Sequence, residues 1–279
     1  MKVNVWLIYD TVRAAKNADY IDMHYQLAKE FGMQLKLVMD TEAEEFLMSG
    51  ERPDICFMRT IRPLLSRRLE ERGICVLNPA FVSEICNDKG KTIQYIQENT
   101  LVPVIPTKRY KRGRLSRELL LQNRDSVIKS VDGHGGSQVF LTSDSYEQLE
   151  KGIGTSDFIV QPFISGEGKD IRIYVIGNRI VGAVERTATK GFKSNFSLGG
   201  QVRSCQMDKK LYDYVQAICA VFSFGMVGID FLVNESGDVL LNEIEDVVGA
   251  RMFYECYPQR NILREYFAYA KQLSAHNNQ

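Results

Sequence analysis

Residues 226–248 read Met-Val-Gly-Ile-Asp-Phe-Leu-Val-Asn-Glu-Ser-Gly-Asp-Val-Leu-Leu-Asn-Glu-Ile-Glu-Asp-Val-Val. Two runs rich in β-forming residues flank the polar stretch 234–238, a pattern that predicts a β-hairpin. Asp230 interrupts the first apolar run, and Glu243 and Glu245 close the second. Because alternate residues of a strand share a face, Glu243 and Glu245 should lie together, with Asp230 opposite them on the neighbouring strand.

Three carboxylates on one patch of a sheet repel one another unless a cation neutralises them. Hard oxygen ligands favour Mg²⁺, which proteins usually hold with a few carboxylates together with phosphate oxygens of a substrate. Asp230, Glu243 and Glu245 therefore form a candidate metal site. The alternative is three solvated carboxylates on the open face of a sheet, and the choice depends on whether the chain also carries phosphate-binding groups.

Size and composition are those of an ordinary globular protein. The 279 residues suffice for two or three small domains, and 44% are hydrophobic and 25% charged. A formal net charge of +0 gives no global field that would attract nucleic acid or a membrane. No apolar run approaches the ~18 residues of a membrane span, and the N-terminus resembles a first strand rather than a signal peptide. Six scattered cysteines without a C-x-x-C pair favour a reduced, cytoplasmic protein.

The first 78 residues alternate between strand and helix patterns. The predicted strands are 3–9, 34–39, 54–58 and 74–77, and the predicted helices are 18–31, 41–48 and 63–71. Helices between strands predict a small doubly wound α/β domain with a parallel sheet. No G-x-G-x-x-G follows the first strand, so the sequence does not support dinucleotide binding there.

A glycine-rich loop, 132–137, separates predicted strands at 126–131 and 138–141, and Lys129 lies in the first of them. Backbone N–H groups free of side-chain bulk can cover phosphates while a lysine neutralises them. The loop is not a P-loop, because G-K-[ST] is absent and no helix follows directly. A hairpin turn without a ligand is the alternative.

The stretch 108–117 is strongly basic. Its simplest interpretation is a solvated loop and helix start, and the alternative is a patch that steers an acidic partner. A nucleic-acid-binding module is disfavoured by the neutral charge and by the lack of interleaved aromatic residues beyond Tyr110.

In their order along residues 75–250, these features resemble the ATP-grasp superfamily and, within it, the RimK-like carboxylate–amine ligases. The segments that carry the resemblance are N-D-K-G-K-T (87–92), V-I-K-S-V-D-G-H-G-G-S-Q-V (127–139), V-Q-P-F-I (160–164), K-D-I-R (169–172), V-E-R (184–186), G-F-K-S-N (191–195), G-I-D-F (228–231) and N-E-I-E (242–245). The resemblance implies an N-terminal domain at 1–78, followed by a two-lobed α+β ATP-grasp fold. Its N-lobe would span 79–160, with the glycine-rich loop, and its C-lobe 161–279, with the metal-binding hairpin.

The resemblance also implies roles for individual residues. Those implied to bind ATP are Lys89, Lys129, Gly133, Gly135, Gly136, Ser137, Gln161, Phe163 and Ile164. Those implied to hold the phosphate or acyl-phosphate region are Arg172, Arg186 and Asn195. Those implied to bind Mg²⁺, for which Mn²⁺ can substitute, are Asp230, Glu243 and Glu245. The sequence departs from the family at Pro162, where an acidic residue is common, at Glu245, where Asn is usual, and at 246–251, where A-S-P-G is common.

The activity implied by the resemblance is ATP-dependent ligation of a carboxylate to an amine through an acyl phosphate. The implied substrates are an amino acid such as glutamate and a peptide, protein tail or amino-acid-derived metabolite, and ligases of this type are often homo-oligomers. Neither nucleic acid nor membrane is an expected partner. The alternative is a catalytically silent ATP-binding protein on the same fold, which the intact Lys129, Asp230 and Glu243 disfavour.

Overall fold

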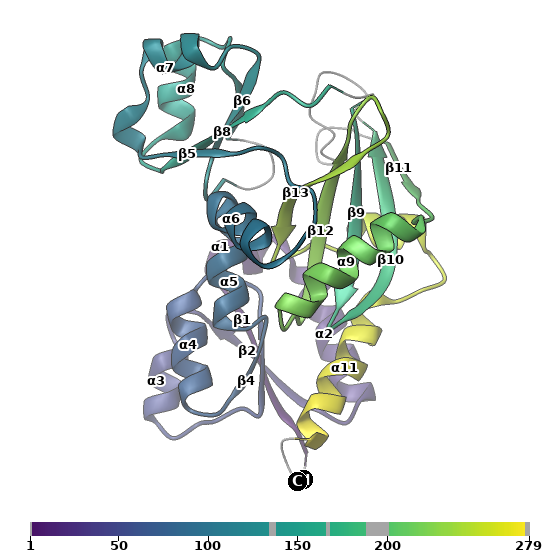
Figure 1. The fold of residues 1–279 in the computed structure, drawn as a ribbon. Coiled ribbons are helices and arrows are strands. Elements are labelled where there is room, and N and C mark those ends of the chain that lie inside the picture. Colours follow the sequence, from purple (N-terminus) through teal and green to yellow (C-terminus); the bar gives the residue numbers. More distant parts are fainter. Residues whose placement is uncertain (1, 134–137, 166–167, 188–200, 277–279) are drawn as a thin grey trace.

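A computed structural model describes residues 2–133, 138–165, 168–187 and 201–276, and this part of the chain forms three β-sheets (Figure 1). The N-terminal sheet is parallel, and the two that follow, here called the middle sheet and the large sheet, are antiparallel. This confirms the predicted fold class. Within the described ranges, no helix has the length and apolar character needed to cross a membrane.

The N-terminal unit has helices on both faces of its sheet. Its elements are β1 (Asn4–Tyr9), α1 (Thr11–Lys16), α2 (Ala18–Glu30), β2 (Gln34–Met39), α3 (Ala43–Met48), β3 (Ile55–Met58), α4 (Pro63–Glu71) and β4 (Cys75–Leu77), with strand order β2-β1-β3-β4. Trp6 and Ile8 pack toward α3 and α4, whereas Val5 and Leu7 pack toward α2. Because both faces are covered, the strand β1 reads as a continuous apolar run rather than an alternating one.

The middle unit follows. Its elements are α5 (Ala80–Cys86), α6 (Lys89–Asn99), β5 (Lys108–Tyr110), the 3₁₀ turn η1 (Arg112–Arg114), α7 (Arg117–Gln122), β6 (Ser126–Ser130), β7 (Val139–Leu141), α8 (Tyr146–Ile153) and β8 (Phe158–Pro162), with sheet order β5-β8-β6-β7. Ile128 and Val160 pack on α7 and α8. Lys129 and Gln161 alternate with these residues and therefore point to the opposite face of the middle sheet.

The large sheet closes the chain. Its elements are β9 (Lys169–Ile176), β10 (Arg179–Thr187), β11 (Gln201–Ser204), α9 (Lys209–Val221), β12 (Met226–Val233), β13 (Val239–Glu245), α10 (Arg251–Cys256) and α11 (Ile262–His276), with sheet order β11-β10-β9-β12-β13. Ile173 and Ile229 pack against α9 on one face. On the other face, Ile176 and Met226 share a core with α11 and the N-terminal sheet. The N-terminal unit is thus fixed to one half of this face.

Asn78 joins the N-terminal unit to the large sheet. Its Nδ2 donates to the carbonyl oxygens of Met226 and Asp246 and to Asp246 Oδ1, at 2.8–2.9 Å. Its Oδ1 accepts from the N–H groups of Gly225 and Met226 at 2.6 and 3.1 Å. Asn78 is only 2% exposed, so one side chain satisfies several buried backbone groups at this junction.

Replacing Asn78 with alanine is expected to lower the free energy of unfolding by roughly 3 kcal/mol or more, because several buried groups lose their partners together. Denaturant unfolding would measure the loss, with Asn99→Ala as the control because Asn99 is exposed and makes only a local bond to Tyr95. Equal unfolding midpoints for the two variants would contradict the assigned role of Asn78.

Candidate functional site

The structure contains the predicted hairpin, formed by β12 and β13. Asp230 is paired with Glu243, and Gly228 is paired with Glu245. The register shifts between Asp230 and Phe231, which leaves Asn242 as the extra residue of a β-bulge. A bulge redirects side chains. Here Asn242 accepts a hydrogen bond from Lys129 Nζ at 2.8 Å, so the bulge connects the large sheet to the middle sheet.

Asp230 lies under two arginines of the large sheet. Arg172 donates from Nε and Nη2 to its two carboxylate oxygens, each at 2.7 Å, and Arg186 donates from Nη2 at 2.7 Å. Arg186 is also paired with Asp170. Burial opposes ionisation of Asp230, which is 1% exposed, but the arginines outweigh burial and hold its pKa at about 2. Asp230 is therefore ionised and already engaged by protein cations.

Glu243 and Glu245 are more open, with side chains 32% and 31% exposed. Burial would raise the pKa of Glu243, but Lys89, whose Nζ is 3.2 Å away, contributes most to a net lowering. Burial raises the pKa of Glu245, and Arg172, whose Nη1 is 2.5 Å away, offsets this only in part. That Arg172 nitrogen faces Oε2 of Glu245 as an ion pair, without the geometry of a hydrogen bond. An added cation would stabilise the charged form of Glu245.

Two lysines of the middle unit face these carboxylates. Lys89 is the first residue of α6, after the N-cap Asp88, and its Nζ also donates to the carbonyl oxygen of Gly133 at the start of the glycine-rich loop. Lys129 is 8% exposed, and burial lowers its pKa to about 8 although Glu243 opposes the shift. Both lysines thus lie between the glycine-rich loop and the hairpin, where a polyanion would find positive charge.

Gln161, another residue implied to bind ATP, lies on the same side of the middle sheet as Lys129. Gln161 is 1% exposed, and its Nε2 donates to Thr107 Oγ1 at 2.8 Å, whereas its Oε1 is buried without a partner. Phe163 is 40% exposed where the chain leaves β8, and Ile164 beside it is partly exposed. A buried acceptor beside an exposed ring suits a planar group that carries an N–H donor.

Several predicted residues fall outside the described ranges. They are Gly135, Gly136, Ser137 and Asn195. Gly133 is described, and a Cβ added there would come within 3.0 Å of the Gln138 side chain, so close packing favours glycine at the start of the loop.

The three hairpin carboxylates do not form a ready metal cage. Among the described residues, no group of three or more His, Cys, Asp or Glu side chains is placed to hold a metal ion. The reason is that Asp230 is turned toward Arg172 and Arg186. Glu243 and Glu245 fit a hard cation better, because they share one face of β13 and are partly exposed. Mg²⁺ commonly uses one or two carboxylates when substrate phosphates complete its shell.

Sequence reasoning gave no role to Asn242 or Asp170. Asn242 stands next to Glu243 in N-E-I-E, and Asp170 belongs to the segment K-D-I-R that contains Arg172. Asp170 shares a strand face with Arg172, two residues on, and that spacing could have indicated a second carboxylate at the site. The bulge that directs Asn242 toward Lys129 has no comparable local signal.

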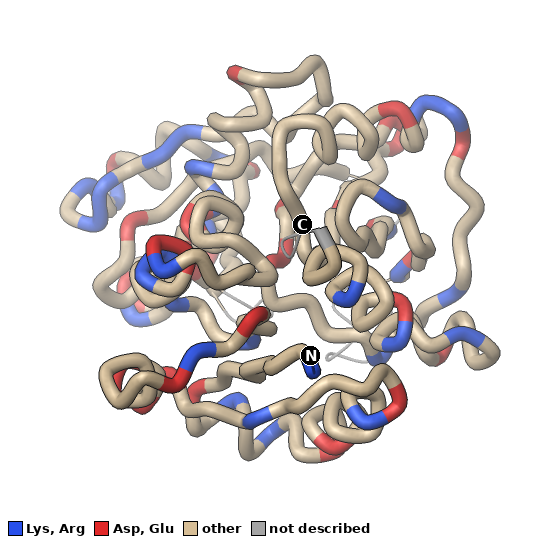
Figure 2. Tube along the Cα trace, turned by 90° about the horizontal axis from the view of Figure 1, so that it is seen from below, with Lys and Arg blue, Asp and Glu red and all other residues tan. Residues whose placement is uncertain are grey.

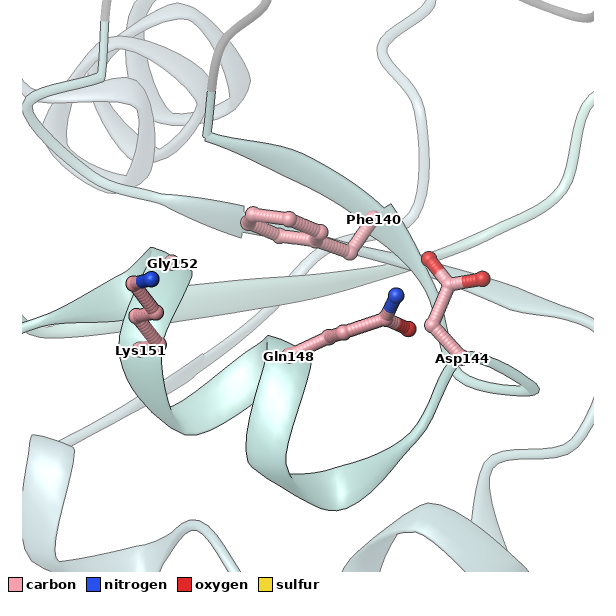
Figure 3. Close-up of a pocket in the computed structure, with 5 residues that line it drawn as sticks. All are labelled: Phe140, Asp144, Gln148, Lys151 and Gly152. Carbon is pink, nitrogen blue, oxygen red and sulfur yellow. The ribbon is translucent and has the colours of Figure 1, made fainter.

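A hollow of about 420 Å³ lies away from these residues (Figure 3). In the close-up, the ring of Phe140 lies over α8, with Gln148 and Lys151 on the helix below. Phe140 pairs with Ile128, on the face of the middle sheet that packs against α8. Lys129 points to the other face, so this hollow is separate from the candidate site.

The basic stretch 108–117 finds acidic partners within the chain. Its ion pairs include Arg109–Asp88 at 2.8 Å, Lys111–Asp157 at 2.9 Å and Arg117–Glu147 at 2.7 Å. Acidic and basic residues are interspersed around the molecule (Figure 2). The structure therefore favours the interpretation of this stretch as a solvated loop and helix start.

Comparisons with a protein family, with relatives in sequence and with solved structures each match more than half of this chain. The RimK-like ATP-grasp domain family matches residues 88–264. "Uncharacterized protein MG011" of Mycoplasma genitalium is 29% identical over 191 residues, which are 68% of this chain and 64% of that protein. Human "N-acetylaspartylglutamate synthase A" is 30% identical over 219 residues, 72% of this chain and 56% of that protein. The aligned regions are therefore less than two thirds of either relative.

A D-alanine–D-alanine ligase from Bacillus anthracis, solved in complex with ATP, superposes with a TM-score of 0.74 at 13% identity, over 99% of this chain and 98% of that one. At this identity the likeness concerns the fold. The family match, by contrast, covers more than half of the chain and includes Lys89, Lys129 and the carboxylate hairpin. On these grounds the chain belongs to the RimK-like ATP-grasp family.

Proposed function

We propose that this protein is an ATP- and Mg²⁺-dependent ligase that joins a carboxylate to an amine through an acyl phosphate. The observation that carries this proposal is a charge-balanced set of side chains between the middle and large sheets. Its cations are Lys89, Lys129, Arg172 and Arg186, and its carboxylates are Asp170, Asp230, Glu243 and Glu245.

Charge balance explains why a metal should enter together with the nucleotide. A polyphosphate alone would add negative charge to a site whose own charges already cancel. Lys89 and Lys129 would exchange Glu243 and Asn242 for phosphate oxygens, which would free the Glu243 carboxylate. Glu243 and Glu245 would then hold Mg²⁺, with Mn²⁺ as a substitute, and the metal would neutralise charge on the transferring phosphoryl group.

Acyl-phosphate chemistry needs positioning and charge more than covalent help. An oxygen of the substrate carboxylate attacks the γ-phosphorus, and the bond to the bridging oxygen breaks and releases ADP. The amine nitrogen then attacks the acyl carbon, phosphate leaves with the electron pair, and the nitrogen loses a proton. Lys129 and Arg172 would stabilise the negative charge of these steps. Exclusion of water would protect the acyl phosphate, and the glycine-rich loop that begins at Gly133 could supply that cover.

Glutamate, or a similar acidic amino acid, is the amine that we propose. The name of the human relative describes a product that contains glutamate, which supports this choice. The carboxylate would come from a peptide, a protein tail or an amino-acid-derived metabolite. The six cysteines are free, which supports a reducing compartment such as the cytoplasm as the place of action.

The direct test is ADP release from Mg-ATP in the presence of amino acids, short peptides and acidic metabolites, with mass spectrometry of the products. We expect a new mass equal to two substrates minus water, and we expect Lys129→Ala to abolish it because phosphate charge goes unneutralised. Lys151→Ala is the control, since Lys151 is an exposed lysine of the same unit. ATP binding without turnover in any pool would favour the silent ATP-binding alternative.

Nucleotide affinity should depend on pH through Lys129. Its pKa in the free protein lies at about 8, below the ordinary 10.5, and the charged form is the one that binds phosphate. Affinity should therefore be full below pH 8 and fall by up to about tenfold per unit as pH rises above it. Calorimetric titration with a non-hydrolysable ATP analogue and Mg²⁺ would measure this fall. Lys129→Met should bind the nucleotide weakly, and its affinity should not fall as the pH rises above 8. If the affinity of the wild-type protein changed with pH in parallel with that of Lys129→Met, the assignment would be refuted.

The metal assignment separates Glu243 and Glu245 from Asp230. Glu243→Gln and Glu245→Gln should each raise the Mg²⁺ concentration for half-maximal activity by roughly tenfold or more, because each removes a ligand charge. Asp230→Asn should instead lower the free energy of unfolding by about 3–5 kcal/mol, because it removes the buried carboxylate that Arg172 and Arg186 share. Glu235→Gln, at an exposed position of the same hairpin, is the control. Unchanged Mg²⁺ titrations for both glutamate variants would exclude them as ligands.

A further inference from the structure

A buried arginine without a carboxylate partner lies at the carboxyl end of β3, an inner strand of the N-terminal sheet. Arg59 follows β3 directly and is 6% exposed. Its Nη2 donates to the carbonyl oxygen of Val248 at 2.9 Å, and its Nε has no partner. The groups that act on its charge most strongly are phenols rather than carboxylates. Asp246 is within electrostatic reach, but Asn78 and Asn87 bind its two oxygens.

Two tyrosine hydroxyls near Arg59 are also buried donors without an acceptor. The hydroxyls of Tyr9 and Tyr20 are buried, and neither has an acceptor for its hydrogen. The Tyr9 oxygen interacts with the Arg59 side chain, and Arg59 Cζ is 5.5 Å from the centre of the Tyr20 ring. Burial raises the pKa of Tyr20, so its hydroxyl stays protonated and can donate. Buried charges are seldom left unpaired, and a buried donor without an acceptor is destabilising. Arg59 Nε and the two hydroxyls are therefore three donors that an oxygen-rich anion would satisfy.

The topology of the sheet points to the same place independently. The strand order is β2-β1-β3-β4. From β1 the chain continues to β2 on one side, and from β3 it continues to β4 on the other side, so the strand order reverses between β1 and β3. Open α/β sheets bind ligands outside the carboxyl ends of the two strands at such a switch point. Tyr9 is the last residue of β1, and Arg59 comes immediately after β3.

This cluster adjoins the proposed transfer site. Val248, which accepts from Arg59, and Gly249, which accepts from Tyr174 Oη at 3.2 Å, belong to the segment that follows the carboxylate hairpin. Tyr174 is two residues from Arg172 on β9, on the same face of the sheet. A substrate with one end at Arg59 could thus direct its other end toward Arg172.

We propose that Arg59, Tyr20 and Tyr9 bind a carboxylate of the amino-acid substrate, the one that takes no part in the new bond. This subsite rests on the proposed ligase function, since it assigns the donors to a substrate of that reaction. It selects substrates that carry a second, unreacted carboxylate at one end.

Binding can be tested without turnover, by titrating the full chain with L-glutamate and, as neutral counterparts, L-glutamine and isoglutamine. We expect wild-type protein to bind L-glutamate and to discriminate against one of the two amides. Tyr20→Phe removes only an unpartnered hydroxyl, so it should keep the fold and weaken L-glutamate binding by about tenfold. Arg59→Gln should weaken it further. Arg62→Gln is the control, because Arg62 lies in the same loop but is exposed and 3.5 Å from Asp40.

Wild-type affinity in Tyr20→Phe would overturn the subsite, even if Arg59→Gln failed to fold. So would the absence of L-glutamate binding by the wild-type protein. Arg59-dependent binding together with no ADP release from any substrate pool would remove the ligase proposal and leave a carboxylate-binding site. The two proposals can therefore fail separately.

Discussion

Half of one face of the large sheet carries buried charges, and each of them must be paired. Asp230 on that face is only 1% exposed and forms ion pairs with Arg172 and Arg186. Removing Asp230 would take away the buried carboxylate that both arginines share, which is strongly destabilising. The apolar half of the same face packs on α11 and the N-terminal sheet, so the polar half is left to face the middle sheet. One sheet face thus provides both a core and a candidate site.

Two contacts between the middle unit and the hairpin of the large sheet are ones that a polyphosphate would replace. Lys129 reaches Asn242, and Lys89 reaches Glu243. In the free protein these bonds satisfy the lysines and neutralise Glu243. Exchange of these partners for phosphate and metal would keep every charge paired, so nucleotide binding and closure of the two sheets would be coupled. The partial exposure of Glu243 is consistent with such an exchange.

Local patterns predicted most of the fold. The helix predicted at 63–71 is α4, and the β-forming runs that flank the polar stretch 234–238 form the predicted hairpin. Features set by distant contacts were not visible in this way. The bulge at Asn242, for example, depends on the pairing of β12 with β13. Arg59 follows an apolar strand without any motif, and only the packed structure reveals that it has no carboxylate partner. The roles of the site residues remain predictions.

A crystal structure with a non-hydrolysable ATP analogue and Mn²⁺ would test the central claim most directly, because manganese can be located by anomalous scattering. We expect the triphosphate within hydrogen-bond distance of Lys89 and Lys129, and an anomalous peak coordinated by Glu243 and Glu245. Asp230 should keep its bonds to Arg172 and Arg186. A nucleotide bound elsewhere, or manganese coordinated without either glutamate, would contradict the proposed division between metal ligands and buried ion pairs.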